Sequence, residues 1–440
     1  MAKRSTLAAL SVAAVALAAS FALARDTQPA DPPSYDELEL LARVMALVDA
    51  EYVEPVESDA LVQGALDGAL KKLDPHSSYV PPVDFSKQRQ AARLEYGGLG
   101  IEVTMEGGLV KVNYATEEGP AYESGIRSGD YITAVDGNSV LGKTLDDAVE
   151  GMRGIAGEPV TVTVLSGDTS RDVTVTRRKV VGRAVRHRVE QGLGYIFITT
   201  FNNANLTRDT KRALDMLEAE MGGTPPGLII DLRGNRGGLL DQSVNISGLF
   251  LDGGEVVSIR GRENTDTERH HAEAGEVFAG VPIVVLVSPG SASAAEIVAG
   301  ALQDRGRAVV IGRRTFGKGS VQSVIPLPGD KGALRLTTQR YFTPSGRSIQ
   351  GQGIMPDLLV AAVEDTGEIQ KRFREDSLPN FLMNDEDADY EERYEDVQYP
   401  PEALPDDVDY QLRRAVEVLK TSQYQRLLDA QFALSSQPTQ

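Results

Sequence analysis

The chain has 440 residues, 41% of them hydrophobic, and it contains neither cysteine nor tryptophan. This length is sufficient for two or three domains with large cores, so folding does not depend on disulfide bonds. The formal net charge of −19 at pH 7 argues against nucleic acids and anionic membranes as partners, because both repel an acidic protein.

Residues 1–24 have the pattern of a secretory signal. Lys3 and Arg4 form a positively charged start, an apolar run follows, and the segment 22–24 reads Ala-Leu-Ala, an A-x-A cleavage site. We therefore expect export to the periplasm, with an uncleaved membrane anchor as the alternative interpretation. No later apolar run approaches the 18 residues of a membrane span, so we expect the mature chain to be soluble.

Residues 25–90 form a predicted N-terminal helical segment. Apolar residues recur at helical spacing twice within 34–72, and the second helix is predicted to begin at Ser58. His76 follows in a loop. None of the chain's four histidines has the spacing of zinc ligands, so we predict neither a metal site nor a catalytic histidine.

Residues 91–179 form a predicted β-rich domain. A glycine-rich loop runs into a strand at 96–103, and the run G-D-Y-I-T-A-V-D-G occupies 129–137. Further strands are expected at 110–115, 159–167 and 171–179, a Gly-Pro-Ala turn at 119–121 and a short helix at about 144–153. A glycine-rich loop alone is usually only a turn, but together these features resemble a PDZ domain.

The PDZ resemblance implies a binding site for the free C-terminus of a peptide. Such a peptide adds as an edge strand, and backbone N–H groups of the glycine-rich loop hold its carboxylate. The side chains of Leu99 and Ile101 are expected to line a pocket for its last residue. The residues implied in substrate binding are Gly98, Leu99, Gly100 and Ile101.

Residues 180–363 return to an α/β pattern. A strand is predicted at 192–201 and an amphipathic helix at 206–221. A buried strand then leads into the turn D-L-R-G-N-R-G-G at 231–238, with a helix from about 239. Such a turn places backbone N–H groups where negative charge develops, although a plain connection between strand and helix has the same pattern.

Ser293 lies where the predicted strand 281–288 gives way to a helix. The N–H of Ala294 is then in the unpaired first turn, at the positive end of the helix dipole, which suits an oxyanion. Serine needs a base to become a nucleophile. The alternative interpretation is a capping box, because Ser293-Ala-Ala-Glu296 has the pattern S-x-x-E.

Lys318 is the candidate base. It stands between two glycines, and the sequence has no acidic residue between Asp304 and Asp330. Burial lowers the pKa of a lysine by up to about 3–5 units, which makes a neutral amine accessible. If 318–326 is a strand, Lys318, Ser320 and Gln322 share a face, and Gln322 could orient the amine. A solvated turn is the alternative, and we interpret Asp304 as structural.

The C-terminal segment, 364–440, has two parts. Residues 364–407 are acidic and contain prolines, so we expect a mobile or surface-wrapping segment. Residues 408–431 are predicted to be helical, with an apolar stripe that includes Leu412 and Val416. Such a stripe usually packs on the chain's own core, and contact with a second subunit is the alternative.

Two stretches carry a family resemblance. Residues 291–297 and 316–322 resemble the motifs S-A-S-A-S-E-I and F-G-K-G-x-V-Q of the carboxy-terminal processing peptidases, or tail-specific proteases. The resemblance implies Ser293 as nucleophile, Lys318 as general base and Gln322 as its orienting partner. Ala295 replaces the third serine of the first motif.

The resemblance also covers the glycine-rich turn, where the family has D-L-R-x-N-P-G-G. We assign the oxyanion hole to the N–H of Ala294 and a second N–H from Gly237 or Gly238. Arg236 stands where the family has proline, which could loosen the turn.

The resemblance extends over 35–363 and implies a multi-domain α/β protein. Its parts would be a crotonase-like peptidase core (180–363), an inserted PDZ domain of β-sandwich or barrel form, and helical N- and C-terminal segments. The implied reaction is hydrolysis of peptide bonds near protein C-termini through an acyl-enzyme, without metal or cofactor. The implied partners are protein or peptide substrates, with a periplasmic adaptor and a homo-oligomer left open. The alternatives are a PDZ adaptor on an inactive core and an acyl-CoA enzyme.

Overall fold

The structure is a computed structural model. It describes residues 35–86, 96–116, 119–167, 169–179, 184–263, 265–363, 374–384, 396–405 and 408–435. The predicted signal, 1–24, and most of the acidic stretch 364–407 lie outside these residues. The chain divides into two units, Met1–Leu66 and Asp67–Gln440. None of the helices within the described ranges is long and apolar enough to cross a membrane.

Two helices follow each other at the start of the described chain, α2 (Tyr35–Glu51) and α3 (Ser58–Lys71). They confirm the two helices predicted within 34–72. Over these described residues, neither helix has a fully buried side chain.

The predicted β-rich domain forms two small sheets and two helices. One sheet has the order β3-β4-β5-β8-β9, with β6 on β5, and the other has the order β10-β2-β7. Its core contains Val160, Val162 and Val164 of one strand, at the alternate positions that point to one face. The predicted turn at 119–121 instead opens the short helix α5, because proline at the first helical position presets the backbone.

The elements of this domain are β2 (Tyr96–Gly98), β3 (Ile101–Glu106), β4 (Leu109–Ala115), α5 (Pro120–Glu123), β5 (Tyr131–Val135), β6 (Asn138–Ser139), α6 (Leu145–Met152), β7 (Gly154–Ile155), β8 (Pro159–Ser166), β9 (Thr169–Thr176) and β10 (Arg178–Lys179).

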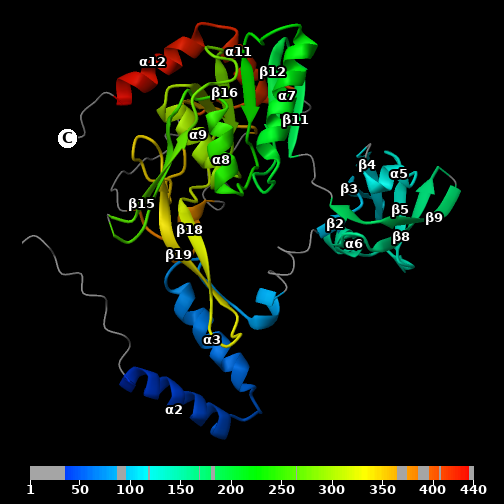
Figure 1. Ribbon diagram of the computed structural model, residues 1–440, viewed down its shortest axis with the longest axis vertical. Coiled ribbons are helices and arrows are strands. Elements are labelled where there is room, and N and C mark those ends of the chain that lie inside the picture. The colour runs from blue at the N-terminus through cyan, green and yellow to red at the C-terminus, as the bar shows by residue number, and fades with distance from the viewer. Residues whose placement is uncertain are drawn as a thin grey trace, which may run out of the picture. The chain divides into compact units, whose positions relative to one another are not determined.

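A six-stranded sheet with the order β11-β12-β13-β16-β17-β20 forms the centre of the α/β region (Figure 1). All neighbouring strands from β12 to β20 are parallel, and β11 is antiparallel to β12. The strands are β11 (Val185–Glu190), β12 (Leu193–Ile198), β13 (Leu228–Asp231), β16 (Ile283–Val287), β17 (Ala308–Gly312) and β20 (Leu358–Leu359).

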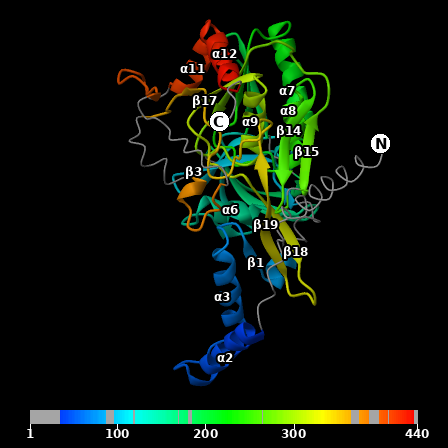
Figure 2. The same ribbon diagram turned by 90° about the vertical axis from the view of Figure 1, so that its left-hand side faces the viewer.

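Helices cover both faces of this sheet. Ile230 and Val285 pack with α7 (Leu206–Met221), α8 (Leu240–Gly248) and α9 (Ala294–Asp304). Ile229 and Val284, on the opposite face, pack with α11 (Tyr410–Leu419) and α12 (Gln423–Ser435). Figure 2 shows α7 and α8 on one side and α11 and α12 on the other. The C-terminal stripe therefore packs on its own core, as predicted, but in two helices that are separated after Leu419.

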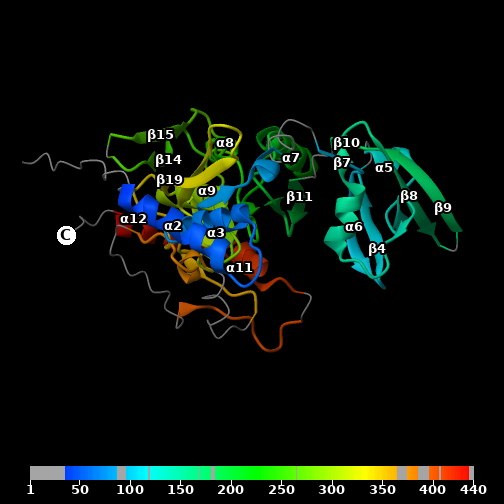
Figure 3. The same ribbon diagram turned by 90° about the horizontal axis from the view of Figure 1, so that it is seen from below.

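A second, antiparallel sheet carries the region after Lys318. Strand β19 (Ala333–Phe342) pairs with β1 (Ser78–Val80), β14 (Gly254–Arg260) and β18 (Ser320–Pro326), and β15 (Thr267–Ala272) pairs with β14. Strand β14 also lies against α9 (Figure 3). The pairing of Ser78 with Arg335 brings the loop that contains His76 next to the β18–β19 hairpin.

Candidate active site

Ser293 caps the N-terminus of α9 in a strained conformation. Its φ of 56° lies in a region that residues other than glycine seldom adopt. The surrounding turn holds it there. The Ser291 hydroxyl donates to the Leu232 carbonyl at 2.8 Å, and the Ala292 N–H donates to the Asn235 carbonyl at 2.9 Å. The serine therefore stands at the carboxyl end of the parallel strands, where ligands bind in such sheets.

The glycine-rich turn lies against this serine. A Cβ on Gly237 would stand 2.9 Å from both the Ala294 nitrogen and the Ser293 Cβ, so only glycine fits. The Gly237 N–H donates to Asn235 Oδ1 at 2.9 Å. The N–H groups of Gly238 and Ala294 have no acceptor within the described part of the chain. These two N–H groups are therefore available to hydrogen-bond an oxyanion. Glycine at 237 lets the turn lie close to Ser293 and Ala294.

Arg236, at the position of the family proline, is exposed. The turn is held by the buried Asn235, whose amide donates to the Ile198 carbonyl at 2.8 Å. The turn therefore forms without the proline.

Glu296 joins the two catalytic candidates. Its Oε2 accepts the N–H of Ser293 at 2.7 Å and the N–H of Lys318 at 2.9 Å. Its Oε1 accepts the Gly317 N–H at 2.7 Å and the Thr315 hydroxyl at 2.5 Å. The predicted capping contact thus exists, and the same carboxylate also holds the lysine turn.

Lys318 has a half-buried side chain in this turn. Burial lowers the pKa of Lys318; Glu375 acts to raise it, Arg335 to lower it and Glu296 to raise it, and the pKa remains below its usual value. Its amine has no hydrogen-bond partner among the residues that the structure describes. A lysine with a lowered pKa and an unengaged amine is suited to accept a proton.

The prediction that the strand starts at Lys318 is wrong, because β18 begins at Ser320. The N–H groups of Lys318 and Gly319 donate to side chains, Glu296 and Gln350 respectively, instead of to a neighbouring strand. Ser320 and Gln322 do share a face, since the Gln322 amide donates to the Ser320 hydroxyl at 3.0 Å.

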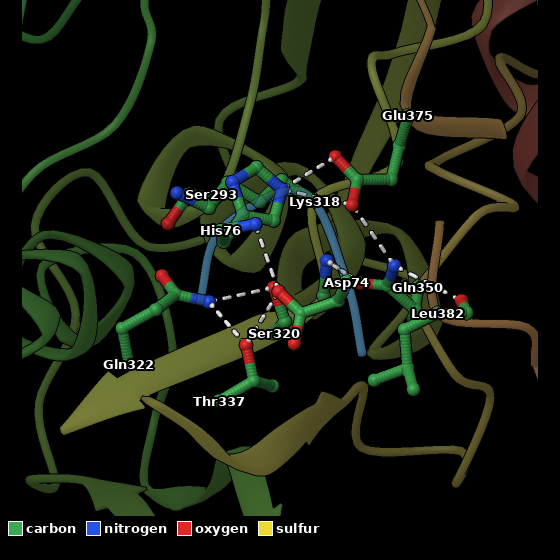
Figure 4. Close-up of polar contacts among 12 residues, drawn as sticks. Asp74, His76, Ser293, Lys318, Ser320, Gln322, Thr337, Gln350, Glu375 and Leu382 are labelled. Carbon is green, nitrogen blue, oxygen red and sulfur yellow. Dashed lines mark hydrogen bonds and ion pairs between the residues drawn. The ribbon is translucent and has the colours of Figure 1, made fainter. Parts of the chain in front are cut away.

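The Gln322 amide is fixed by a network that starts in the loop before β1. Its Nε2 also donates to the Thr337 hydroxyl at 3.2 Å, and that hydroxyl donates to Asp74 at 3.1 Å (Figure 4). Burial opposes ionisation of Asp74, but hydrogen bonds from Ser77, His76 and Thr337 lower its pKa overall. Because both N–H bonds of the Gln322 side-chain amide have acceptors, its side-chain oxygen Oε1 remains available to accept a hydrogen bond.

The structure brings two further residues to this site: Glu375, which no sequence motif singles out, and His76, for which the sequence predicts neither catalysis nor metal binding. The His76 Nε2 lies 2.9 Å from each oxygen of Glu375 (Figure 4). The Glu375 side chain is fully buried, so the prediction of a mobile or surface-wrapping segment is wrong at this residue. An acidic stretch offers no sequence signal for a buried glutamate.

Asp304 lies at the end of α9 and pairs with Arg347. It also accepts the Ser345 N–H at 2.9 Å. It is not among the charges that act on Lys318, which agrees with the structural role predicted for it.

The four residues implied in C-terminus binding lie at the junction of β2 and β3. The N–H groups of Leu99 and Gly100 have no acceptor among the described groups. Gly100 has a φ of 73°, which favours glycine. The Leu99 side chain is buried in the domain core, so the prediction that it lines an open pocket is wrong. Ile101 is only partly buried and remains the candidate for that pocket.

Within the described ranges, no group of three or more histidine, cysteine, aspartate or glutamate side chains could hold a metal ion.

Family models match three parts of the chain. Residues 192–360 match Peptidase family S41, residues 111–166 match the PDZ domain, and residues 8–82 match the Activating protease CtpB N-terminal domain. A carboxy-terminal-processing protease of Bartonella bacilliformis is 43% identical over 330 residues, which are 74% of this chain and 76% of the relative. The chain belongs to the carboxy-terminal-processing proteases of peptidase family S41.

Other relatives have related names. A probable CtpA-like serine protease of Staphylococcus aureus is 33% identical over 352 residues, 80% of this chain and 69% of the relative. The solved photosystem II D1 C-terminal processing protease is 29% identical with a TM-score of 0.46, and the match covers 79% of this chain and all of the solved one, 100%. As a member of this family, the chain is a serine-type peptidase, and its fold is multi-domain α/β. Its family favours a peptidase over the acyl-CoA enzyme considered above.

Glu296 gives a prediction on stability. Burial raises the pKa of Glu296 to about 7 from 4.5, against the four hydrogen bonds that it accepts. The folded protein then binds this proton more tightly, so the contribution is fully present below pH 4.5 and is lost as the pH rises through about 7. We expect the stability of the wild type relative to Glu296→Gln to fall over this window by on the order of 3 kcal/mol.

Urea unfolding at several pH values measures this difference. Glu218→Gln, at an exposed position on α7, serves as control and should follow the wild type across the window. A relative stability that instead rises with pH would contradict the prediction and show that the four donors outweigh burial.

Proposed function

We propose that this chain is a periplasmic endopeptidase that binds substrate C-termini through its PDZ domain and cleaves through an acyl-enzyme on Ser293. One observation carries the assignment of the dyad. The Oε2 oxygen of Glu296 accepts hydrogen bonds from the backbone N–H groups of both Ser293 and Lys318, so one atom fixes the backbone of both residues. A half-buried lysine with a lowered pKa next to a strained serine supports a Ser–Lys mechanism.

In the proposed reaction, the neutral amine of Lys318 takes the proton of the Ser293 hydroxyl as its oxygen attacks the scissile carbonyl. The negative charge of the tetrahedral intermediate is stabilised by the N–H groups of Ala294 and Gly238. The intermediate collapses, and Lys318 returns the proton to the leaving amine. Water then hydrolyses the ester with Lys318 again as base. The Gln322 carbonyl oxygen is the acceptor that would orient the ammonium form.

The dyad makes the sharpest prediction. Ser293→Ala and Lys318→Ala should each lower kcat/KM on an unfolded protein substrate by roughly 10⁴-fold or more. Lys318→Arg should be equally inactive, because a guanidinium does not give up its proton. Gln322→Ala should lose about tenfold, the value of a single hydrogen bond. Wild-type activity should rise with pH as the lysine becomes neutral.

The controls for these variants are Ser323→Ala and Lys331→Ala, which change the same residue types outside the site. Both should retain wild-type kcat/KM, and circular dichroism should report the same fold for all variants. Substantial activity in folded Lys318→Ala would refute the Lys318 base.

Recognition of C-termini rests on the loop between β2 and β3, where the N–H groups of Leu99 and Gly100 lack described acceptors. Hydrogen bonds to a charged acceptor contribute roughly 1.5–3 kcal/mol each, and about 1.4 kcal/mol is one decade of affinity. A peptide with a free apolar C-terminus should therefore bind full-length Ser293→Ala at least tenfold more tightly than its C-terminal amide.

Ile101→Glu should remove this preference, and Leu141→Glu should not, because Leu141 is exposed elsewhere on the domain. Isothermal titration calorimetry measures both. Equal affinity for the free and amidated peptides would mean that the domain does not read C-termini.

Export is proposed from the pattern of residues 1–24. Intact-mass measurement of the protein from a periplasmic extract should give a chain that starts at Arg25. A membrane-bound species that still contains the first 24 residues would support the uncleaved anchor instead.

A further inference from the structure

Glu375 lies outside the S41 match, 192–360, yet it is buried in the active site. Its own N–H donates to the carbonyl of Phe316 at 2.9 Å. This contact ties the segment 374–384 to the turn that carries Lys318.

The Glu375 carboxylate is held from two further sides. The His76 Nε2 lies 2.9 Å from both oxygens, and the Gln350 amide donates to Oε1 at 3.1 Å. The side-chain oxygen Oε1 of the same Gln350 accepts the Gly319 N–H at 3.0 Å. Glu375 is thus linked to residues on both sides of Lys318, directly to Phe316 and through Gln350 to Gly319.

Three charged side chains act on Lys318, and they come from different elements. Glu375 comes from the segment 374–384, Arg335 from β19 and Glu296 from α9, and Glu375 has the largest effect of the three. Glu296 already accepts four hydrogen bonds. Glu375 faces His76 on one side, so its carboxylate has a titratable neighbour besides the lysine.

We propose that Glu375, held by His76 and Gln350, is a positioning residue that fixes the Lys318 turn and its electrostatic environment. The segment after the S41 match is then part of the active site. This inference rests on the proposed function, because it takes Lys318 to be the general base.

The charge of Glu375 has a directional consequence. A nearby anion favours the ammonium form, so it opposes the effect of burial on the lysine. Without this anion the amine becomes neutral at lower pH. The protein therefore balances two requirements: a lysine that is neutral at working pH, and one that is still basic enough to take a proton from serine.

The test compares full-length Glu375→Gln with Asp376→Asn. The control removes a charge from the adjacent residue, which pairs with Arg374 and is partly exposed. The profile of kcat/KM against pH is measured on an unfolded protein substrate. The midpoint of its acid limb should move to lower pH in Glu375→Gln and stay at the wild-type value in Asp376→Asn. A purely structural role would lower the rate without moving the midpoint.

A second readout is independent of turnover. In a Ser293→Ala background, acetylation of Lys318 by acetic anhydride is followed against pH by mass spectrometry, with exposed Lys331 as reference. Adding Glu375→Gln should move the labelling midpoint to lower pH. If the Gln variant does not fold, Glu375→Asp keeps the negative charge but moves it away from Lys318, because aspartate is shorter. Its labelling midpoint should also lie below the wild-type value.

An unchanged or higher midpoint in both readouts overturns the inference. The result for Lys318→Ala separates this failure from that of the proposed function. If Lys318→Ala is inactive while Glu375→Gln titrates like the wild type, only the role of Glu375 is wrong. If Lys318→Ala is active, the proposed function itself fails.

Discussion

The arrangement of the active site depends on one buried carboxylate. Glu296 is fully inaccessible to solvent, and its two oxygens accept four hydrogen bonds from Ser293, Thr315, Gly317 and Lys318. A buried charge is costly unless it is paired and hydrogen-bonded, and these donors offset part of that cost, since the pKa of Glu296 is still raised. Because the donors come from both the helix start and the lysine turn, the same interaction that satisfies the carboxylate also sets the distance between the two chain segments.

The glycine-rich turn is also held by the helices on the far face of the central sheet. The turn that contains Gly238 follows β13, and Arg233 of this turn donates to Asp231 at 2.6 Å and to Asp409 at 2.7 Å. Asp409 caps α11, which packs on the face of the sheet opposite α9. The C-terminal helices are therefore connected to the glycine-rich turn as well as to the core, and the described parts of the C-terminal segment contact the candidate site twice.

Opposing effects set the pKa of Lys318. Burial favours the neutral amine, and the carboxylates of Glu375 and Glu296 favour the ammonium. A lysine in a fully apolar pocket would be a weaker base, and one in contact with a carboxylate would stay protonated. The Lys318 pKa lies between these limits, below its usual value, because burial outweighs the two carboxylates.

The sequence by itself determined the features that depend on neighbouring residues. Helix α7 follows from apolar periodicity, and Ser293, Lys318 and the glycine-rich turn lie in short motifs with a local conformation. Only the tertiary structure placed His76 against Glu375, since 299 residues separate them and an acidic stretch usually remains at the surface. It also turned the Leu99 side chain into the domain core and started β18 at Ser320. Sequence pattern specifies local backbone and burial, whereas contacts between distant segments depend on how the packed elements bring them together.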